Sequence, residues 1–273
     1  MPSTESQSAQ VPASELHRQR RVAESFGADP ERYDRSRPRF PDALAERIMA
    51  GIGAGRVLDV GTGTGIVGRQ FAAAGAEVLG VDPDPRMAGF ARRSGLEVEQ
   101  ATFESWEPAG RRFDAVVSGQ TWHWLDPVAG AAKAARILRP GGRLAVFWNA
   151  EQPTPELREA FAAVYRRTMP DSLAARQWTE AGLQGYAVLC GRATGGMAEA
   201  GAFGEPEQWS FDWERSYTRD EWLDQVPTHG DHGQFPAATQ AELLAGIGAA
   251  LDAAGGGFTM RYRTLVATAV RTA

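Results

Sequence analysis

Short apolar runs alternate with longer segments of helical periodicity over most of the chain. The runs that predict β-strands cover residues 56–60, 77–81, 96–101, 113–118 and 143–148. The segments between them have the lengths and turn residues of helices. The pattern therefore predicts consecutive βα units and a parallel sheet.

The pattern changes after residue 149. Residues 151–203 contain helical stretches such as 155–168, which glycine-rich segments interrupt, and show no clear strand. We interpret this part as a helical insertion that covers the carboxyl edge of the sheet. Two more strands are predicted at 207–213 and 258–270, and the second follows three consecutive glycines.

Several turn and cap residues mark the ends of predicted helices. Gly75 is placed to end the helix after the first strand in a left-handed cap, and Asp84 with Pro85 to begin the next helix. Thr218 and Thr239 each precede a glutamate by three residues. That spacing predicts a capping box at the start of two later helices.

The most informative motif lies between the first strand and its helix. Residues 57–65 read Val-Leu-Asp-Val-Gly-Thr-Gly-Thr-Gly, and Asp82 ends the second strand. Glycines permit positive φ and close backbone approach, so a ligand can lie against the turn and the N-terminus of the helix. Asp82 lies at the carboxyl end of the neighbouring strand, where an acid can accept both hydroxyls of a ribose. Together these features predict a nucleoside-containing cofactor.

This turn fits two cofactor motifs. Counted from Gly63, it reads Gly-x-Gly-x-x-Gly with an acid about twenty residues on, as an NAD site requires. Counted from Gly61, it reads acid-x-Gly-x-Gly-x-Gly, with Asp59 inside the strand. The second register resembles motif I of the class I S-adenosylmethionine (SAM) dependent methyltransferases, and residues 80–84 resemble their second motif. The SAM contacts that this resemblance implies are Asp59, Gly61, Gly63, Asp82 and Pro83.

The order of the later segments extends the resemblance to about residues 20–272. It implies an α/β fold, a Rossmann-like seven-stranded methyltransferase sheet with helices on both faces and an antiparallel last strand. The expected parts are a disordered tail at 1–14, an N-terminal helical lid at 15–50, the SAM-binding core at 51–150, a helical substrate cap at 151–203 and the completion of the sheet at 204–273.

An N-terminal motif narrows the resemblance. Tyr33-x-x-x-Arg37-Pro38-x-Phe40-Pro41 resembles a motif of a bacterial subgroup close to the trans-aconitate and ubiquinone-type (type 11) small-molecule methyltransferases, with Phe40 in place of a tyrosine. In that subgroup the segment folds over the cofactor, which implies that Tyr33 and Arg37 lie near the methionyl end of SAM. A guanidinium suits this position because it can bind a carboxylate bidentately. The alternative is a surface arginine that fixes a proline turn.

The adenine is expected beside the segment after the third strand. Thr102-Phe103-Glu104-x-Trp106 resembles the subgroup's pattern at this place. The resemblance implies that Thr102 and Phe103 flank the base, with a backbone amide on its ring nitrogens, and that Met87 touches it. Core packing is the alternative for both Phe103 and Met87.

The loop after the fourth strand carries the candidate chemistry. Residues 118–126, Ser-Gly-Gln-Thr-Trp-His-Trp-Leu-Asp, resemble the subgroup's Gln-Ala-x-His-Trp-Phe-Asp loop. The resemblance implies that Gln120 lies beside the cofactor. His123 is the candidate catalytic residue, as a general base or a positioning residue, and a packed structural histidine is the alternative. Trp122 and Trp124 are expected to line the substrate site with His123, unless they fill the core.

Two more histidines follow the sixth strand, in Thr228-His229-Gly230-Asp231-His232. The subgroup has a Ser/Thr-rich stretch here, so His229 and His232 are candidate substrate contacts, and an exposed loop is the alternative. With Asp231 they also suggest a metal site. Three ligands within four residues and no distant acid or cysteine are too few for one, so we expect no metal.

The composition limits the remaining classes. With 273 residues, 43% of them hydrophobic, and no apolar run of membrane length, the chain is expected to be a cytoplasmic protein without a membrane span or signal peptide. Its single cysteine, Cys190, excludes an internal disulfide. A net charge of −5 disfavours a nucleic-acid partner, although arginines cluster at 18–21. Lys133 is the one lysine, and the absence of a Gly-Lys-Ser/Thr triplet excludes a P-loop.

The predicted function is transfer of a methyl group from SAM to an oxygen or nitrogen of a small hydrophobic or aromatic acceptor, with S-adenosylhomocysteine as the product. The sulfonium is already a strong electrophile, so the protein mainly holds the nucleophile in line at about 3 Å from the methyl carbon. Two alternatives stay open: an NAD(P)-dependent oxidoreductase that uses the other glycine register, and a SAM-binding scaffold without activity. The acceptor and the oligomeric state do not follow from the sequence.

Overall fold

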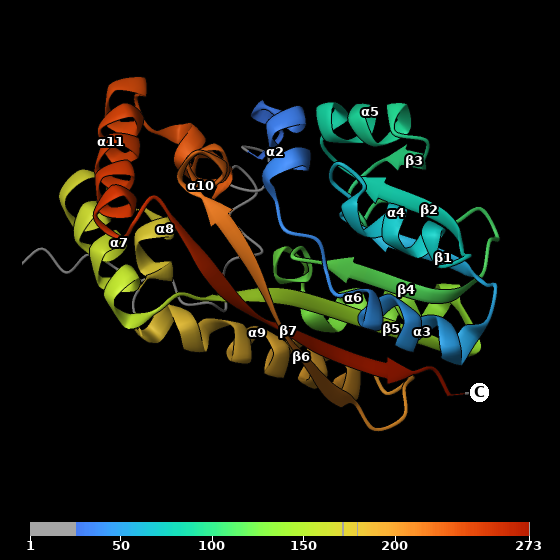
Figure 1. Cartoon of the computed structure of the whole chain (residues 1–273). Coiled ribbons are helices and arrows are strands. Elements are labelled where there is room, and N and C mark those ends of the chain that lie inside the picture. Colours follow the sequence, from blue (N-terminus) through green and yellow to red (C-terminus); the bar gives the residue numbers. More distant parts are fainter. Residues whose placement is uncertain (1–25, 171, 179, 273) are drawn as a thin grey trace, which may run out of the picture.

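The computed structural model of the chain describes residues 26–170, 172–178 and 180–272 (Figure 1). The expected disordered tail at 1–14, the arginine cluster at 18–21 and the first part of the expected lid, 15–25, lie outside the described residues.

Seven strands form one sheet in the order β3-β2-β1-β4-β5-β7-β6. The strands are β1 Arg56–Val60, β2 Glu77–Asp82, β3 Glu97–Gln100, β4 Phe113–Gly119, β5 Leu138–Gln152, β6 Glu207–Thr218 and β7 Gly257–Val270. β1 to β5 are parallel, and β7 lies antiparallel between β5 and β6. The expected α/β sheet with an antiparallel last strand is therefore confirmed.

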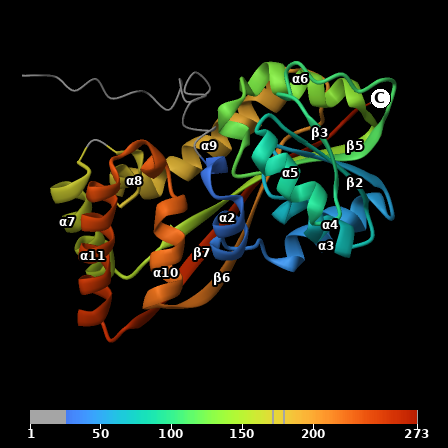
Figure 2. The ribbon, with the colours of Figure 1, turned by 90° about the horizontal axis from the view of Figure 1, so that it is seen from above.

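Helices cover both faces of the sheet. They are α2 Pro30–Ser36, α3 Asp42–Ile52, α4 Ile66–Ala73, α5 Pro85–Arg93, α6 Pro127–Ile137, α7 Pro155–Thr168, α8 Leu173–Gln177, α9 Glu180–Glu199, α10 Arg219–Gln225 and α11 Ala237–Ala253. Alternate strand residues point to opposite faces, so Val57 packs with α3 and α4 while Leu58 packs with α6 and α9. Figure 2 shows these helices from above. Within the described ranges, no helix has both the length and the hydrophobicity that crossing a bilayer requires.

Four helices, α7, α8, α10 and α11, gather beyond the carboxyl ends of β5 and β6, and we call them the cap (Figure 1). The largest buried side chains of the cap core are aromatic. They are Phe161, Tyr165, Trp178, Trp222 and Tyr262 of β7. The cap therefore combines two stretches of the chain, one before β6 and one after it.

The remaining helix of the 151–203 stretch, α9, packs along the sheet beside α6. Small residues allow this close approach: a Cβ on Gly196 would stand 2.5 Å from the carbonyl oxygen of Pro127. Cys190 and Met197 of α9 are buried in the same core as the strands. The stretch 151–203 thus supplies only part of the cap.

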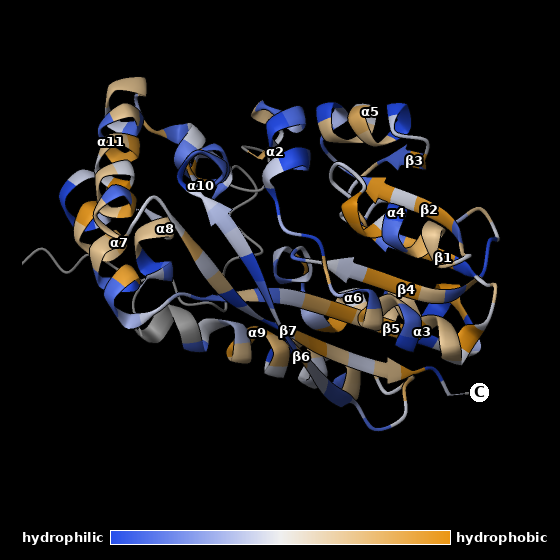
Figure 3. Cartoon of the chain, viewed as in Figure 1, coloured by the Kyte–Doolittle hydropathy of each residue, from blue (hydrophilic) through white to orange (hydrophobic). Residues whose placement is uncertain are grey.

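Two strands are longer than the sequence pattern predicts. β5 continues to Gln152 and β6 to Thr218, whereas the apolar runs end at 148 and 213. The β6 extension is polar because β6 is an edge strand with alternate side chains exposed (Figure 3). In the β5 extension, Asn149 and Glu151 are polar but buried. Ion pairs join β6 to β7: Asp212 pairs with Arg263, and Glu214 pairs with Arg261.

Three of the four predicted helix ends are confirmed. Gly75 has φ +94°, the side chain of Asp84 accepts the amide of Arg86, and Thr218 forms a reciprocal capping box with Glu221. The prediction for Thr239 is wrong. α11 already begins at Ala237 after Pro236, so Thr239 lies inside the first turn.

This difference gives a matched test of helix capping. Thr218→Ala removes the side chain that caps α10 and should lower the free energy of unfolding by about 1 kcal/mol, measured by urea denaturation. Thr239→Ala is the control, because alanine is the better helix former inside α11 and no cap is lost. Equal losses of stability in both variants would contradict the capping assignment.

Candidate active site

The turn between β1 and α4 forms the floor of a cavity. Gly61, Gly63 and Gly65 all have positive φ, at +67°, +55° and +88°. A Cβ on Gly61 would lie 2.1 Å from the Thr121 side chain, so the loop after β4 packs directly on the backbone here. A Cβ on Gly63 would meet nothing within 4 Å. Gly61 is therefore required for packing, and Gly63 leaves its side of the turn open to a ligand.

Asp59 lies beneath this turn, not in the cavity. Its carboxylate is buried and accepts the hydroxyl of Thr62 at 2.6 Å. Burial raises the pKa of Asp59 to about 7. The predicted cofactor contact of Asp59 is thus not present, because β1 directs this side chain into the base of the turn, where it supports the backbone that carries Gly61 and Gly63.

Asp82 ends β2 and faces the cavity. One carboxylate oxygen accepts the Gly63 amide at 2.8 Å and the other accepts the Asp84 amide at 2.9 Å. Burial raises the pKa of Asp82 to about 6. Each oxygen keeps a second acceptor position, so the carboxylate is oriented and still able to bind two hydroxyl groups.

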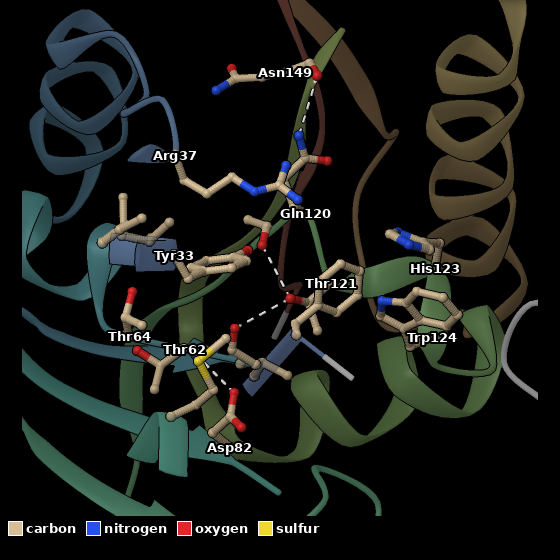
Figure 4. Close-up of a pocket in the computed structure, with 18 of the residues that line it drawn as sticks. Tyr33, Arg37, Thr62, Thr64, Asp82, Gln120, Thr121, His123, Trp124 and Asn149 are labelled. Carbon is tan, nitrogen blue, oxygen red and sulfur yellow. Dashed lines mark hydrogen bonds between the residues drawn. The ribbon is translucent and has the colours of Figure 1, made fainter. Parts of the chain in front are cut away.

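The cavity has a volume of about 500 Å³ and lies at the carboxyl edge of the sheet. Figure 4 labels several of the residues that line it. Most of the predicted site residues line it. They are Tyr33, Arg37, Gly61, Gly63, Asp82, Pro83, Met87, Thr102, Phe103, Gln120, His123, Trp124 and His229. Three do not: Asp59, Trp122 and His232.

The residues predicted to contact adenine belong both to the hydrophobic core and to the wall of the cavity. Met87 of α5 and Phe103 are only 4% and 3% exposed, and both still border the cavity. The two interpretations of these residues, core packing and ligand contact, are therefore compatible. Thr102 borders the cavity beside Phe103.

α2 lies between the core and the cap in Figure 1, and its residue Tyr33 borders the cavity. Asp34 of α2 pairs with Arg69 of α4, and Arg35 pairs with Asp224 of α10 at 2.8 Å. These ion pairs are partly exposed, so each contributes little to stability. They nevertheless fix the segment that carries Tyr33 and Arg37.

Arg37 follows directly after α2 and lies over the ring of Tyr33, with 5.1 Å between its guanidinium carbon and the ring centre. One terminal nitrogen donates to the carbonyl of Thr228 in the segment after α10. Its Nε is buried and has no partner within the described part of the chain. A buried donor without an acceptor is costly, so this side chain is suited to an anionic ligand group.

Gln120 follows directly after β4 and has a strained conformation. Its φ is +57°, which is uncommon for a residue other than glycine. Its backbone amide donates to the carbonyl of Phe147 at 2.8 Å, and its side-chain amide donates to the carbonyl of Asn149 at 3.2 Å. Both bonds tie the loop to β5 and direct the start of the loop over the cavity.

The short 3₁₀ turn Trp122–Trp124 separates the two tryptophans. Trp122 is 2% exposed and packs in the core against Phe103 and Gly130. His123 and Trp124 border the cavity instead. The prediction that Trp122 contacts the substrate is therefore wrong, since this turn points it toward α6.

The hydrogen bonding of His123 disfavours the role of a general base for this residue. The indole of Trp148 donates to its Nδ1 at 3.1 Å, and burial lowers the pKa of the ring to about 4. The ring is thus neutral near pH 7, and its proton resides on Nε2. His123 can offer a hydrogen-bond donor to a ligand, which fits the positioning role better than the catalytic base.

The two later histidines are buried, so the exposed-loop alternative is wrong. His229 is 2% exposed and borders the cavity, while His232 is 1% exposed and bonds the Tyr165 hydroxyl at 3.0 Å inside the cap. The predicted substrate contact of His232 is therefore not present, because the cap core encloses its ring. Among the described residues, no cluster of three His, Cys, Asp or Glu side chains could hold a metal ion.

The sequence interpretation missed the polar residues at the cap end of the cavity. Asn149 and Glu151 of β5 and Gln177 of α8 border it. Asn149 and Glu151 stand two residues apart, directly after an apolar strand, and so point to one face at the carboxyl edge. That alternation was a usable signal, but it was hidden because the strand was predicted to end at 148.

Comparisons with known proteins agree with this geometry. A family model described as a methyltransferase domain matches residues 57–142. An uncharacterized methyltransferase of Mycobacterium tuberculosis is 37% identical over 127 residues, which cover 46% of this chain and 52% of that protein. The match thus spans about half the length of this relative.

Two further comparisons cover more of the chain. A malonyl-[acyl-carrier protein] O-methyltransferase of Enterobacter lignolyticus is 34% identical over 170 residues, or 60% of this chain and 67% of that enzyme. A solved structure from Anaeromyxobacter dehalogenans, assigned provisionally as a type II methyltransferase, has a TM-score of 0.61 and 24% identity. It covers 86% of this chain and 97% of that one, and it shows the shared fold.

The buried Asp59 carboxylate predicts a pH-dependent stability. Its pKa is about 7 in the folded chain against an ordinary 3.8, so the folded state binds the proton more tightly than the unfolded state. The free energy of unfolding contributed by this group therefore falls as the pH rises from about 4 to about 7. Asp59→Asn removes this titration and should gain on the order of 2–4 kcal/mol relative to the natural chain over that interval.

Urea denaturation of both proteins at pH 4 and pH 7 measures this gain. Asp212→Asn is the control. Arg263 lowers the pKa of the exposed Asp212, so any change of stability with pH in this variant should have the opposite sign. A difference between the Asp59 variant and the natural chain that does not vary with pH would contradict the prediction.

Proposed function

Because this chain belongs to the SAM-dependent methyltransferases, we propose that it binds SAM in this cavity and transfers the methyl group to an oxygen or nitrogen of a small-molecule acceptor. The observation that carries the proposal is Asp82, whose carboxylate is fixed by the Gly63 and Asp84 amides where a ribose would lie. The open side of Gly63 leaves room for the cofactor backbone. S-adenosylhomocysteine would be the product.

The remaining parts of SAM have matching partners along the cavity. The unpartnered Nε of Arg37 suits the methionyl carboxylate, and Met87, Thr102 and Phe103 form a wall for adenine. Bound SAM supplies an electrophilic methyl group, which needs no activation by the protein. The chain's own residues hold the acceptor in line and exclude water.

The acceptor is proposed to lie beyond Gln120, toward the cap. Trp124, Leu125, Tyr186 and Leu189 border this part of the cavity, which supports a hydrophobic or aromatic acceptor. His123 would orient it through the donor at Nε2. An extended apolar wall with a few polar groups is typical of a small-molecule site.

The oxidoreductase alternative would be expected to show a proton donor such as a Tyr-x-x-x-Lys pair, and Lys133 has no tyrosine four residues before it. The one lysine, Lys133, donates its Nζ hydrogens to the carbonyls of Glu104 and Trp106 and does not border the cavity. This supports the methyltransferase over the dehydrogenase. A catalytically silent scaffold would bind SAM and transfer no methyl group to any compound of a broad acceptor screen.

Calorimetric titration with S-adenosylhomocysteine tests the cofactor. Asp82→Ala should weaken binding by about 1.5–3 kcal/mol, the cost of losing hydrogen bonds to a charged group. Asp212→Ala, on the outer edge strand, is the control and should bind as the natural chain does. Binding of NAD(H) without S-adenosylhomocysteine, or an unchanged affinity in Asp82→Ala, would overturn the assignment.

Turnover with an acceptor from the screen tests His123. If the ring acts as a donor that orients the acceptor, His123→Ala should lower kcat by about tenfold, and Trp148→Phe should lower it too because the ring proton is no longer confined to Nε2. A loss of about 100-fold or more in His123→Ala, with Trp148→Phe unaffected and cofactor affinity intact, would identify a general base instead.

A further inference from the structure

The loop of residues 101–106, which follows β3, carries the wall proposed for adenine. Its members Thr102, Phe103 and Glu104 border the cavity. The loop closes on itself through two backbone bonds, because the amides of Ser105 and Trp106 both donate to the carbonyl of Thr102, at 3.1 and 2.9 Å. Local bonds of this kind fix the shape of a loop, but its position relative to a ligand needs contacts with other elements.

One such contact joins the end of the loop to β3. The indole of Trp106 donates to the carboxylate of Glu99, and Arg111 pairs with the same carboxylate at 2.7 Å. Within the described part of the chain, none of these three side chains borders the cavity. This cluster therefore anchors the loop at a distance from the proposed adenine wall.

The second contact comes from Lys133 of α6. Its Nζ donates to the carbonyl of Glu104 at 3.0 Å and to the carbonyl of Trp106 at 2.5 Å. The same nitrogen lies 5.4 Å from the centre of the Phe103 ring, within the range of a cation–π interaction. Hydrogen bonds from an ammonium are stronger than those between neutral groups. A single side chain thus contacts three residues of the loop.

The helix that carries Lys133 also supports the Phe103 ring from behind. Trp122 packs on Phe103 with 6.2 Å between the ring centres. Trp122 in turn lies against Gly130 of α6, where an added Cβ would stand 3.1 Å from the indole. Phe103 therefore rests on α6 through two routes, the indole of Trp122 and the ammonium of Lys133.

The ammonium of Lys133 has no equivalent nearby. It belongs to the one lysine of the chain. Arg136, one turn later on α6, is exposed and makes no hydrogen bond to the loop among the described residues. Lys133 itself does not border the cavity, so any effect on a ligand is exerted through the loop.

We propose that Lys133 is a positioning residue for the nucleoside end of the cofactor, which holds residues 102–106 in the place that receives adenine without touching the ligand. The inference rests on the proposed function. When the loop is already ordered in the free protein, binding does not bear the entropic cost of ordering it. Loss of the ammonium should therefore weaken the binding of any ligand that contains the nucleoside.

Calorimetric titration with two ligands tests this role: S-adenosylhomocysteine, and 5′-methylthioadenosine, which has the same nucleoside without the amino acid. Lys133→Met removes the charge and the donors at similar length, and it should weaken both ligands by about tenfold. The two factors should be equal, because the loss lies at the shared end. Lys133→Arg keeps the charge and should stay within about threefold of the natural chain.

Arg136→Met is the matched control, because it removes an exposed cation of the same helix that does not hold the loop. It should bind both ligands as the natural chain does. The thermal midpoints of the unliganded variants report on folding, and they should match that of the natural chain.

Acetylation of the folded protein removes the charge without a mutation. Sulfosuccinimidyl acetate converts the Lys133 amine to a neutral amide and also acetylates the α-amino group of the chain. In Lys133→Arg only the α-amino group can react, so this variant controls for that second modification. The acetylated natural chain should bind S-adenosylhomocysteine about tenfold more weakly than before, whereas Lys133→Arg should bind it equally before and after treatment.

The inference is overturned if Lys133→Met binds both ligands as the natural chain does, or if it weakens S-adenosylhomocysteine alone. It is also overturned if Lys133→Arg loses as much affinity as Lys133→Met, or if acetylation of Lys133 leaves the affinity unchanged. Failure of the proposed function gives a different result, since the natural chain itself would then not bind S-adenosylhomocysteine.

Discussion

The hydrogen bond from the Gly63 amide to the Asp82 carboxylate joins the turn after β1 to the end of β2, and the cavity floor depends on this link. The amides of Gly61 and Thr62 donate to the carbonyl of Val81, so three consecutive amides of the turn are bonded to the neighbouring strand. Such a turn needs positive φ at its glycines. A side chain at Gly61 would also displace Thr121, and with it the loop that carries the ligand-facing groups after β4.

The features of the site that depend on neighbouring residues could be predicted from the sequence. The glycine turn, the acid at the end of β2 and the Asp84 cap depend on residues close in the chain. The seven-stranded sheet with its antiparallel last strand followed from the family resemblance. The direction of Trp122 did not follow, because one residue of rotation in a 3₁₀ turn decides between core and cavity. The burial of His229 and His232 did not follow either, since helices from distant parts of the chain enclose them.

The cavity thus has two ends of different origin. The core end is made by short turns at the carboxyl edge of the parallel strands, where α/β sheets bind ligands. The cap end is made where β5 extends past its parallel neighbour and meets α8 and α10. Membership of the methyltransferases accounts for the core end. The proposed function assigns the acceptor to the other end, where the polar groups come from separate segments and their pairing is a tertiary property.

The position of β7 between β5 and β6 has a consequence for how the molecule is assembled. β6 has no pairing surface on the sheet until the later β7 is in place, because β7 separates it from β5. α7 and α11, which belong to the same cap core, are also separated by more than 60 residues. Contacts between such distant segments form slowly. During synthesis the parallel core can therefore form first, while the cap end of the cavity is completed only after β7 has emerged from the ribosome.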